Sequence, residues 1–403
     1  MPPRKKKSAA PASRTGYSDA AKTAVQESTL RVQEMHSAIA GKSFDILRKI
    51  PLLSGPAQFV QNAHDAIAAG VYAAIRHGTG GLLGVAATVE KHTAGLTPEK
   101  SPGRLASGLR SALNGAFGDH LAASNNLLAI DMAIYANGAP VALDADALHN
   151  AFPHAGKRLC VFIHGLSCDE HCWETGKTAA ESKIDFGRQL HAEFDYTPLY
   201  LRYNTGLPIA RNGAQLAILL DAIWATWPRP AGEIVIVGHS MGGLIALDAC
   251  EQAAAAEMRW LHATRMLICL GSPHLGSPVE RLGHLATALL NLSKITAPLG
   301  KIAAARSQGI KDLRHGPGAT RHPPHHIAFR FLGASLTEDI KHPFGEFLGD
   351  GLVTLGSATA HEIEGDVQSA RLGNVSHMGL LNDMRVYRQI REWVAALYRR
   401  TGA

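Results

Sequence analysis

The sequence predicts an α/β protein in which a mostly parallel sheet is covered on both faces by helices. From about residue 121 onward, short apolar runs rich in β-branched residues alternate with longer amphipathic segments. Buried strands that alternate with helices are typical of parallel sheets. One of these runs leads through a glycine-rich turn straight into a helical segment, and the chain contains 40 glycines, which suit many tight strand-to-helix turns.

The expected elements follow one another along the chain. An Asn137-Gly138 pair predicts a β-hairpin that joins strands at 127–135 and 141–143. Further strands are expected at 158–163, 198–203, 233–237, 266–270 and 327–332. Apolar residues at helical spacing predict helices at 179–194, 214–227, 242–256 and 380–399.

The domain organisation has four parts. Residues 1–18 are expected to form a basic tail, and residues 19–120 an alanine-rich helical region without a catalytic motif. Residues 121–403 form the expected catalytic domain. It is interrupted by an insertion at 277–325, where leucines recur at helical spacing. Such an insertion is either a lid over the site or a helix packed permanently on the domain, and the sequence leaves both open.

The charge and hydropathy of the sequence limit the binding partners and the cellular location that we expect. The net charge is +6, and part of it comes from a basic run at residues 4–7. A short run of this kind is usually a solvated tail, so no nucleic-acid partner is expected. No apolar signal region follows it and no stretch of 18 apolar residues exists. We therefore expect a cytoplasmic protein, with peripheral membrane contact and the oligomeric state left open.

The five cysteines are too few for a disulfide framework, and their number is odd, so they cannot all be paired. Cys160, Cys250 and Cys269 lie in apolar runs and are expected to be buried thiols. Cys168 and Cys172 are four residues apart in a loop near the expected site, where a local disulfide remains open. A zinc pair there is disfavoured because no second ligand pair has suitable spacing.

No cofactor or metal is expected. The glycine-rich segment 78–84 lacks the lysine and hydroxyl residue of a phosphate-binding loop. Four histidines gather in a Pro/Gly-rich stretch, but their spacing matches no metal site, and a flexible surface loop is the better interpretation. They are His315, His322, His325 and His326.

The motif that carries chemistry is G-x-S-x-G at 238–242, between the strand 233–237 and a helix. A serine on so sharp a turn needs neighbours without side-chain bulk, which Gly238 and Gly242 provide. Ser240 is then raised above the sheet at the N-terminus of the next helix, where the helix dipole favours developing negative charge. The sequence therefore predicts that Ser240 is a nucleophile.

The strand 158–163 ends in His164-Gly165-Leu166 upstream of this turn. In the fold that uses such a turn, the loop after this strand supplies one oxyanion donor and the residue after the nucleophile supplies the other. We therefore expect the backbone N–H groups of Leu166 and Met241 to form the oxyanion hole. His164 precedes the nucleophile and is interpreted as a loop residue rather than the base.

A catalytic serine needs a histidine base, which in turn needs a carboxylate, and the chain order is serine, acid, histidine. Asp350 is the preferred acid because glycines flank it and Leu-Val follows it. The competing acids are Glu338, Asp339, Glu346 and Asp366. His377, in a loop of small residues before the last helix, is the preferred base, and His361 is interpreted as solvated.

Taken together, five motifs resemble those of the α/β-hydrolase lipases and esterases, closest to the bacterial lipase-like group related to GPI inositol-deacylases. They are F-I-H-G-L (162–166), G-H-S-M-G-G (238–243), G-S-P-H-L-G-S-P (271–278), G-D-G-L-V (349–353) and S-H-M-G-L (376–380). The resemblance covers about residues 120–400 and implies the α/β-hydrolase fold with this triad and oxyanion hole. It also implies that the segment 271–278 shapes the acyl side of the pocket, with His274 structural. Some similar lipases hold a structural calcium, which the sequence does not settle.

The expected activity is hydrolysis of small-molecule or lipid carboxylic esters through an acyl-enzyme. His164, Gly165, His239 and Leu275 are expected to contact the substrate. Three alternatives stay open: an acyltransferase, a thioesterase or amidase with the same triad, and a non-catalytic scaffold on this fold.

Overall fold

The computed structural model describes residues 104–174, 185–277, 307–315, 324–339, 346, 349–359 and 365–401. The expected basic tail, the glycine-rich segment 78–84 and most of the expected helical region lie outside these residues. So do His322, His361 and most of the insertion, of which the described part is 307–315 with the flanking 277 and 324–325.

An eight-stranded sheet with the order β2-β1-β4-β3-β5-β6-β7-β8 forms the centre of the fold. Every neighbouring pair from β4 to β8 is parallel, whereas β1 is antiparallel to both β2 and β4. The predicted, mostly parallel sheet is therefore confirmed. The strands are β1 (Ala133–Ala136), β2 (Ala139–Pro140), β3 (Arg158–Ile163), β4 (Tyr196–Arg202), β5 (Glu233–His239), β6 (Thr264–Leu270), β7 (Ala328–Ala334) and β8 (Val367–Leu372).

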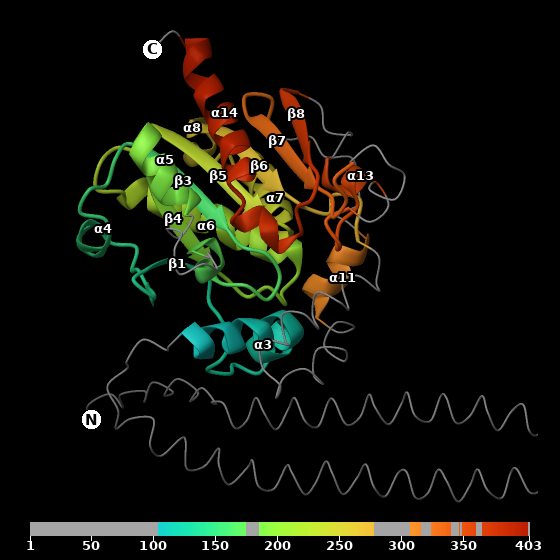
Figure 1. Cartoon of the computed structure of the whole chain (residues 1–403). Coiled ribbons are helices and arrows are strands. Elements are labelled where there is room, and N and C mark those ends of the chain that lie inside the picture. Colours follow the sequence, from blue (N-terminus) through green and yellow to red (C-terminus); the bar gives the residue numbers. More distant parts are fainter. Residues whose placement is uncertain are drawn as a thin grey trace, which may run out of the picture. The chain divides into compact units, whose positions relative to one another are not determined.

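Helices cover both faces of this sheet, and two apolar cores fill the space between (Figure 1). The core on one face is built with α6 (Ile209–Thr226), α7 (Met241–Ala255) and α8 (Arg259–Ala263). On the other face it is built with α5 (Phe186–Phe194) and α14 (Met384–Thr401). Alternate residues of β3 and β5 enter opposite cores, which explains why these strands are apolar throughout.

The remaining elements are shorter or lie nearer the N-terminus. They are α3 (Arg104–Ala123), α4 (Ala145–Ala151), η1 (Glu170–Glu174), α11 (Gln308–His315), α13 (Leu355–Ala358) and η2 (Met378–Leu381).

The predicted hairpin is confirmed, but its first strand is shorter than expected and its second lies at 139–140 instead of 141–143. Asn137 and Gly138 have φ angles of 53° and 78°. Positive φ at both central residues is what a type I′ turn requires. Strand β8 has no counterpart among the predicted strands. None of its residues is buried, so it lacks the apolar run that revealed the inner strands.

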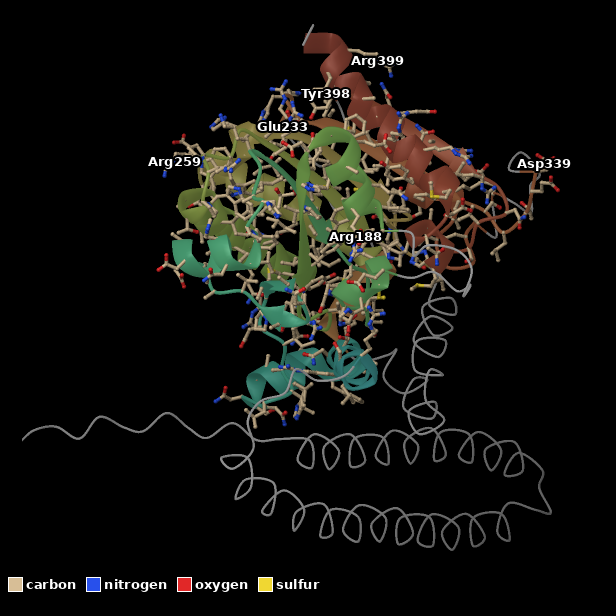
Figure 2. The ribbon with its side chains drawn as sticks, turned by 60° about the vertical axis from the view of Figure 1, so that its left-hand side comes forward. Arg188, Glu233, Arg259, Asp339, Tyr398 and Arg399 are labelled. Atoms are coloured by element: carbon tan, nitrogen blue, oxygen red, sulfur yellow. The ribbon has the colours of Figure 1, made fainter. Side chains whose placement is uncertain are left out.

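Two tyrosines form hydrogen bonds to a glutamate at the end of the sheet where the parallel strands begin. Tyr398, near the end of α14, donates a hydrogen bond of 2.9 Å to Glu233 Oε1 at the start of β5. Tyr196, the first residue of β4, donates to the same oxygen. Figure 2 shows Tyr398 and Glu233 close together at this end. This cluster lies at the opposite end of β5 from Ser240, so we assign it to stability.

The chain divides into two compact units. Residues 100–120 and 130–403 form the unit that contains the sheet, and residues 1–99 and 121–129 form the other. In the described part of that other unit, Asn126 accepts the N–H of Leu128 on its side-chain oxygen. Among the described residues, no helix has both the length and the apolarity needed to cross a membrane.

Candidate active site

Ser240 occupies a strained turn between β5 and α7. Its φ of 53° and ψ of −122° lie in a region that residues other than glycine rarely adopt. A Cβ at Gly238 would lie 2.5 Å from Gly243 Cα, and a Cβ at Gly242 would lie 2.3 Å from the Ile163 carbonyl oxygen. The glycines of the motif therefore allow the strand and the helix to approach each other, as predicted, and they also make room for the neighbouring β3.

Because of this strain, Ser240→Gly is expected to unfold at a higher temperature than Ser240→Ala. Both variants lack the hydroxyl, but only alanine keeps a Cβ in the strained region. The strain costs about 1–3 kcal/mol, and the greater chain entropy of glycine offsets about 0.5–1 kcal/mol of it. Thermal unfolding by circular dichroism would measure the difference. A glycine variant less stable than the alanine variant would contradict the assignment of strain to this residue.

Asp350 and His377 form a buried hydrogen-bonded pair. The distance from His377 Nδ1 to Asp350 Oδ2 is 2.7 Å, and the two side chains are 4% and 0% exposed. The other carboxylate oxygen of Asp350 accepts the N–H groups of Leu352 (3.0 Å) and Val353 (2.8 Å). The N–H of His377 also donates to the Asp350 carbonyl oxygen at 3.0 Å. These bonds hold the carboxylate in place against Nδ1 of the imidazole ring.

The competing acids lie elsewhere. Glu338, Asp339 and Glu346 are exposed, and Figure 2 shows Asp339 at the periphery with its side chain directed outward. Asp366 forms an ion pair of 3.1 Å with Arg330. Asp350 is thus the acid candidate that the structure places in a hydrogen bond with the predicted base His377.

His239 connects the serine turn with the loop of His377. The main-chain oxygen of His377 accepts a hydrogen bond of 3.0 Å from His239 Nε2, and the two ring centroids are 4.7 Å apart. Gly271, the residue that follows β6, also lies against the pair. With a φ of 59°, it would place a Cβ 3.0 Å from Asp350 Oδ2 and 3.4 Å from His377 Cε1. Gly271 is the first residue of the motif 271–278, which the resemblance assigned to the acyl side of the pocket, but its own contact with the Asp350–His377 pair was not predicted.

Burial lowers the pKa of His239 well below its ordinary value, and the neighbouring His377 lowers it further. Burial also lowers the pKa of His164 to about 4. Both rings are therefore neutral near pH 7. The His164 ring stacks on Tyr203 with centroids 4.4 Å apart, and the Tyr203 hydroxyl donates to the His164 carbonyl oxygen at 2.7 Å. These contacts fix the loop that follows β3.

That loop lies directly against the serine turn. A Cβ at Gly165 would be 3.0 Å from Ser240 Cβ and 3.0 Å from His239 Nδ1. Leu166 follows Gly165, and Met241 is the first residue of α7. Within the described part of the chain, neither Leu166 N–H nor Met241 N–H has a hydrogen-bond acceptor. The two groups predicted as oxyanion donors are thus available for an acceptor from outside.

The segment after β6 carries the last of the predicted site residues. Leu275 is 59% exposed, and its N–H donates to Ser357 Oγ at 3.1 Å. His274 packs its ring edge-on against Phe331, with centroids 4.9 Å apart. No contact in the described part of the chain joins Leu275 to Ser240 or His377, so its part in substrate binding stays a prediction.

Trp173 is a buried neighbour of the site that the sequence reasoning missed. Its ring lies edge-on to His239 with centroids 6.5 Å apart, and edge-on to Phe162 with centroids 5.1 Å apart. It belongs to the short η1 helix, where no apolar periodicity marks it as a core residue. Its indole N–H is buried and has no hydrogen-bond partner among the described residues.

All five cysteines are thiols, so the disulfide considered between Cys168 and Cys172 does not form in this structure. Cys160, Cys250 and Cys269 are fully buried, as predicted. Of the histidine cluster, His326 donates its Nε2–H to the Leu261 carbonyl oxygen at 2.9 Å. Within the described ranges, no three His, Cys, Asp or Glu residues gather in a group that could hold a metal ion.

Comparison with known proteins agrees with this architecture. The model of the alpha/beta hydrolase family matches residues 160–397, which is more than half of the chain. The chain therefore belongs to the alpha/beta hydrolase family. A search of curated proteins gives no match.

Several solved structures are similar to the chain. The mature form of the Bacillus licheniformis lipase BlEst2 is 18% identical, covers 58% of this chain and 91% of its own, and has a TM-score of 0.41. A thermophilic esterase from Thermogutta terrifontis is 15% identical, with coverages of 60% and 90% and a TM-score of 0.36. A lipase-esterase related protein from Clostridium acetobutylicum is 13% identical, with coverages of 59% and 94% and a TM-score of 0.35.

Proposed function

We propose that this chain is a serine hydrolase that cleaves carboxylic esters, with Ser240, Asp350 and His377 as its triad. The observation that carries the proposal is the buried 2.7 Å hydrogen bond between His377 Nδ1 and Asp350 Oδ2. The loop of His377 is also hydrogen-bonded to His239, the residue before the strained Ser240. A carboxylate on Nδ1–H holds the imidazole in the tautomer whose Nε2 accepts a proton. That is the state a base needs in order to activate a serine.

The mechanism follows from these roles. Ser240 Oγ attacks the ester carbonyl carbon while His377 Nε2 takes the hydroxyl proton. The oxyanion accepts hydrogen bonds from the N–H groups of Leu166 and Met241, at the positive end of the α7 dipole. His377 then gives its proton to the departing alkoxide, which leaves an acyl-serine. A water activated by His377 releases the acid and restores Ser240.

Apolar esters are the proposed substrates. Leu336 and Met378 are 47% and 36% exposed. The N–H of Leu336 donates to the carbonyl oxygen of Gly349, next to Asp350, at 2.8 Å, and Met378 directly follows the proposed base. Exposed apolar side chains of this size near a site favour an apolar ligand. The resemblance of the five sequence motifs to the lipase-like group related to GPI inositol-deacylases supports the same substrate class.

Hydrolysis of p-nitrophenyl esters from acetate to palmitate tests the proposal. Wild-type protein is expected to release p-nitrophenol, and the preferred chain length separates an esterase from a lipase. A fluorophosphonate probe is expected to add one phosphonyl group to Ser240, which peptide mass spectrometry would locate. Added alcohol would reveal an acyltransferase through the ratio of ester to acid products. Folded protein that neither hydrolyses any of these esters nor takes up the probe would overturn the proposed function.

A further inference from the structure

Three loops meet beside the serine turn: the oxyanion loop (165–169), the segment after β4 (203–207) and the residues that open α11 (307–309). Ser167 N–H donates to Thr205 Oγ1 at 3.1 Å, and Gly309 N–H donates to the Gly206 carbonyl oxygen at 3.2 Å. A Cβ at Gly309 would lie 3.3 Å from Met241 Cε. We call the place where these three loops meet the junction. Of the proposed oxyanion donors, Leu166 belongs to the junction and Met241 borders it.

Helix α3 contacts all three of these loops. Ser107 Oγ donates to Asp169 Oδ2 at 2.7 Å, and both side chains are buried. The Gly118 carbonyl oxygen accepts a hydrogen bond of 2.8 Å from the side chain of Asn204. Asp119 Oδ2 accepts the N–H of Gln308 at 3.2 Å. These bonds leave α3 on both sides of its kink at Phe117, so both parts of the helix are fixed to the three loops.

Small residues line the contact face of α3: three lie four positions apart, on one side of the helix, before a kink at Phe117, and the fourth follows the kink. They are Ser107, Ser111, Gly115 and Gly118. The oxyanion loop is met at Gly115, where a Cβ would lie 1.9 Å from Ser167 Oγ and 3.1 Å from Ser167 Cα. Ser167 has a φ of 59° and directly follows the donor residue Leu166. The absence of a side chain at position 115 therefore sets how near the oxyanion loop lies to the helix.

We propose that α3 positions the oxyanion loop, with Gly115 as the positioning residue. The inference rests on the proposed function, because it concerns the Leu166 N–H as an oxyanion donor. The donor acts on charge that develops only in the transition state, so its displacement lowers kcat and leaves KM nearly unchanged. The helix that precedes the sheet in the chain is thus part of the machinery that stabilises the transition state.

The test compares Gly115→Ala with Gly108→Ala on the same helix. A Cβ at Gly108 meets nothing within 4 Å, so this control is expected to keep wild-type kinetics. Gly115→Ala is expected to lower kcat by about 10²-fold, the scale of a displacement of about 1 Å near reacting groups. The inhibition constant of a trifluoromethyl ketone, which forms the same oxyanion, is expected to rise in parallel. A purely structural role would change the unfolding temperature without these two effects.

A rescue variant completes the experiment. Ser167→Gly removes the two side-chain atoms that lie nearest to the new methyl group, Oγ at 1.9 Å and Cβ at 3.0 Å, and glycine tolerates the positive φ at this position. The double variant Gly115→Ala/Ser167→Gly is therefore expected to regain most of the lost kcat. If Gly115→Ala does not fold, Ser107→Ala tests the same link, with a several-fold loss of kcat expected.

Three results would overturn the inference. The first is a folded Gly115→Ala protein with wild-type kcat, or with a loss confined to KM. The second is an equal loss in Gly108→Ala, and the third is a double variant as impaired as the single one. Wild-type protein that hydrolyses no ester and resists the fluorophosphonate would overturn the proposed function itself, and the inference with it.

Discussion

Replacing Ser240 with alanine is expected to lower kcat for ester hydrolysis by about 10⁶-fold, the size of effect seen when a triad nucleophile is removed. The buried pair of His377 and Asp350 has no nucleophile to activate in this variant. The remaining rate, about 10³–10⁴ above that of water, would come from the oxyanion donors and substrate binding. Steady-state hydrolysis of the preferred p-nitrophenyl ester measures the loss, after repeated purification to exclude contaminating esterases.

Ser272→Ala is the matched control for this experiment. Ser272 is also buried, and its hydroxyl lies close enough to α7 that a Cβ at Gly243 would meet it at 2.1 Å. Its Oγ has no hydrogen-bond partner among the described residues, so alanine removes no hydrogen bond. Ser272→Ala is therefore expected to keep wild-type activity. A Ser240→Ala protein with more than a hundredth of the wild-type rate would exclude Ser240 as the nucleophile.

Replacing Glu170 with alanine is expected to lower the free energy of unfolding by about 3–5 kcal/mol, because it leaves Arg202 buried without its counter-charge. Glu170 and Arg202 form a two-pronged ion pair in which Nε lies 2.6 Å from Oε2. Arg202 is 2% exposed, and its guanidinium lies 4.1 Å above the Tyr135 ring. Thermal unfolding should show a decrease of roughly 10 °C in the melting temperature.

Glu174→Ala on the same η1 helix is the control that separates the effect of burying an unpaired charge from the effect of losing a carboxylate. Glu174 pairs with Arg104 near the surface, where the two side chains are 33% and 57% exposed. Solvent screens such a pair, so its loss is expected to cost less than about 1 kcal/mol. The double variant Glu170→Met/Arg202→Met is expected to be close to wild type in stability. If Glu170→Ala and Glu174→Ala unfolded at the same temperature, the importance assigned to burial would be wrong.

The centre of the fold could be predicted because its signals are local. Strand β3 is apolar at almost every position since both of its faces are buried, and its predicted bounds agree with the structure. The turn at Ser240 is recognisable in the sequence by its glycines, because the packing at this turn leaves no room for side chains at those positions. Asp350 and His377 could be ranked from chain order and flanking residues, and the structure places them in hydrogen-bonding contact.

Other features depend on contacts between distant segments, which local periodicity does not reveal. Glu170 and Arg202 are 32 residues apart, and nothing near either residue indicates the partner. The bond from His239 to the His377 carbonyl spans 138 residues. Strand β8 escaped prediction because a half-exposed edge strand needs no apolar run. The contact between Gly115 and Ser167 depends on a helix that carries no catalytic motif.

The position of α14 has a consequence for synthesis on the ribosome. This last helix supplies much of one apolar core, and its Tyr398 is bonded to the first residue of the central strand β5. The inner strands leave the ribosome well before α14 does, and domains generally fold in the order of their synthesis. The inner strands are therefore synthesised while the face that α14 covers still lacks this helix. Since the proposed base His377 also lies after all the strands, a nascent chain is expected to be inactive until the segment from His377 through α14 has left the ribosome.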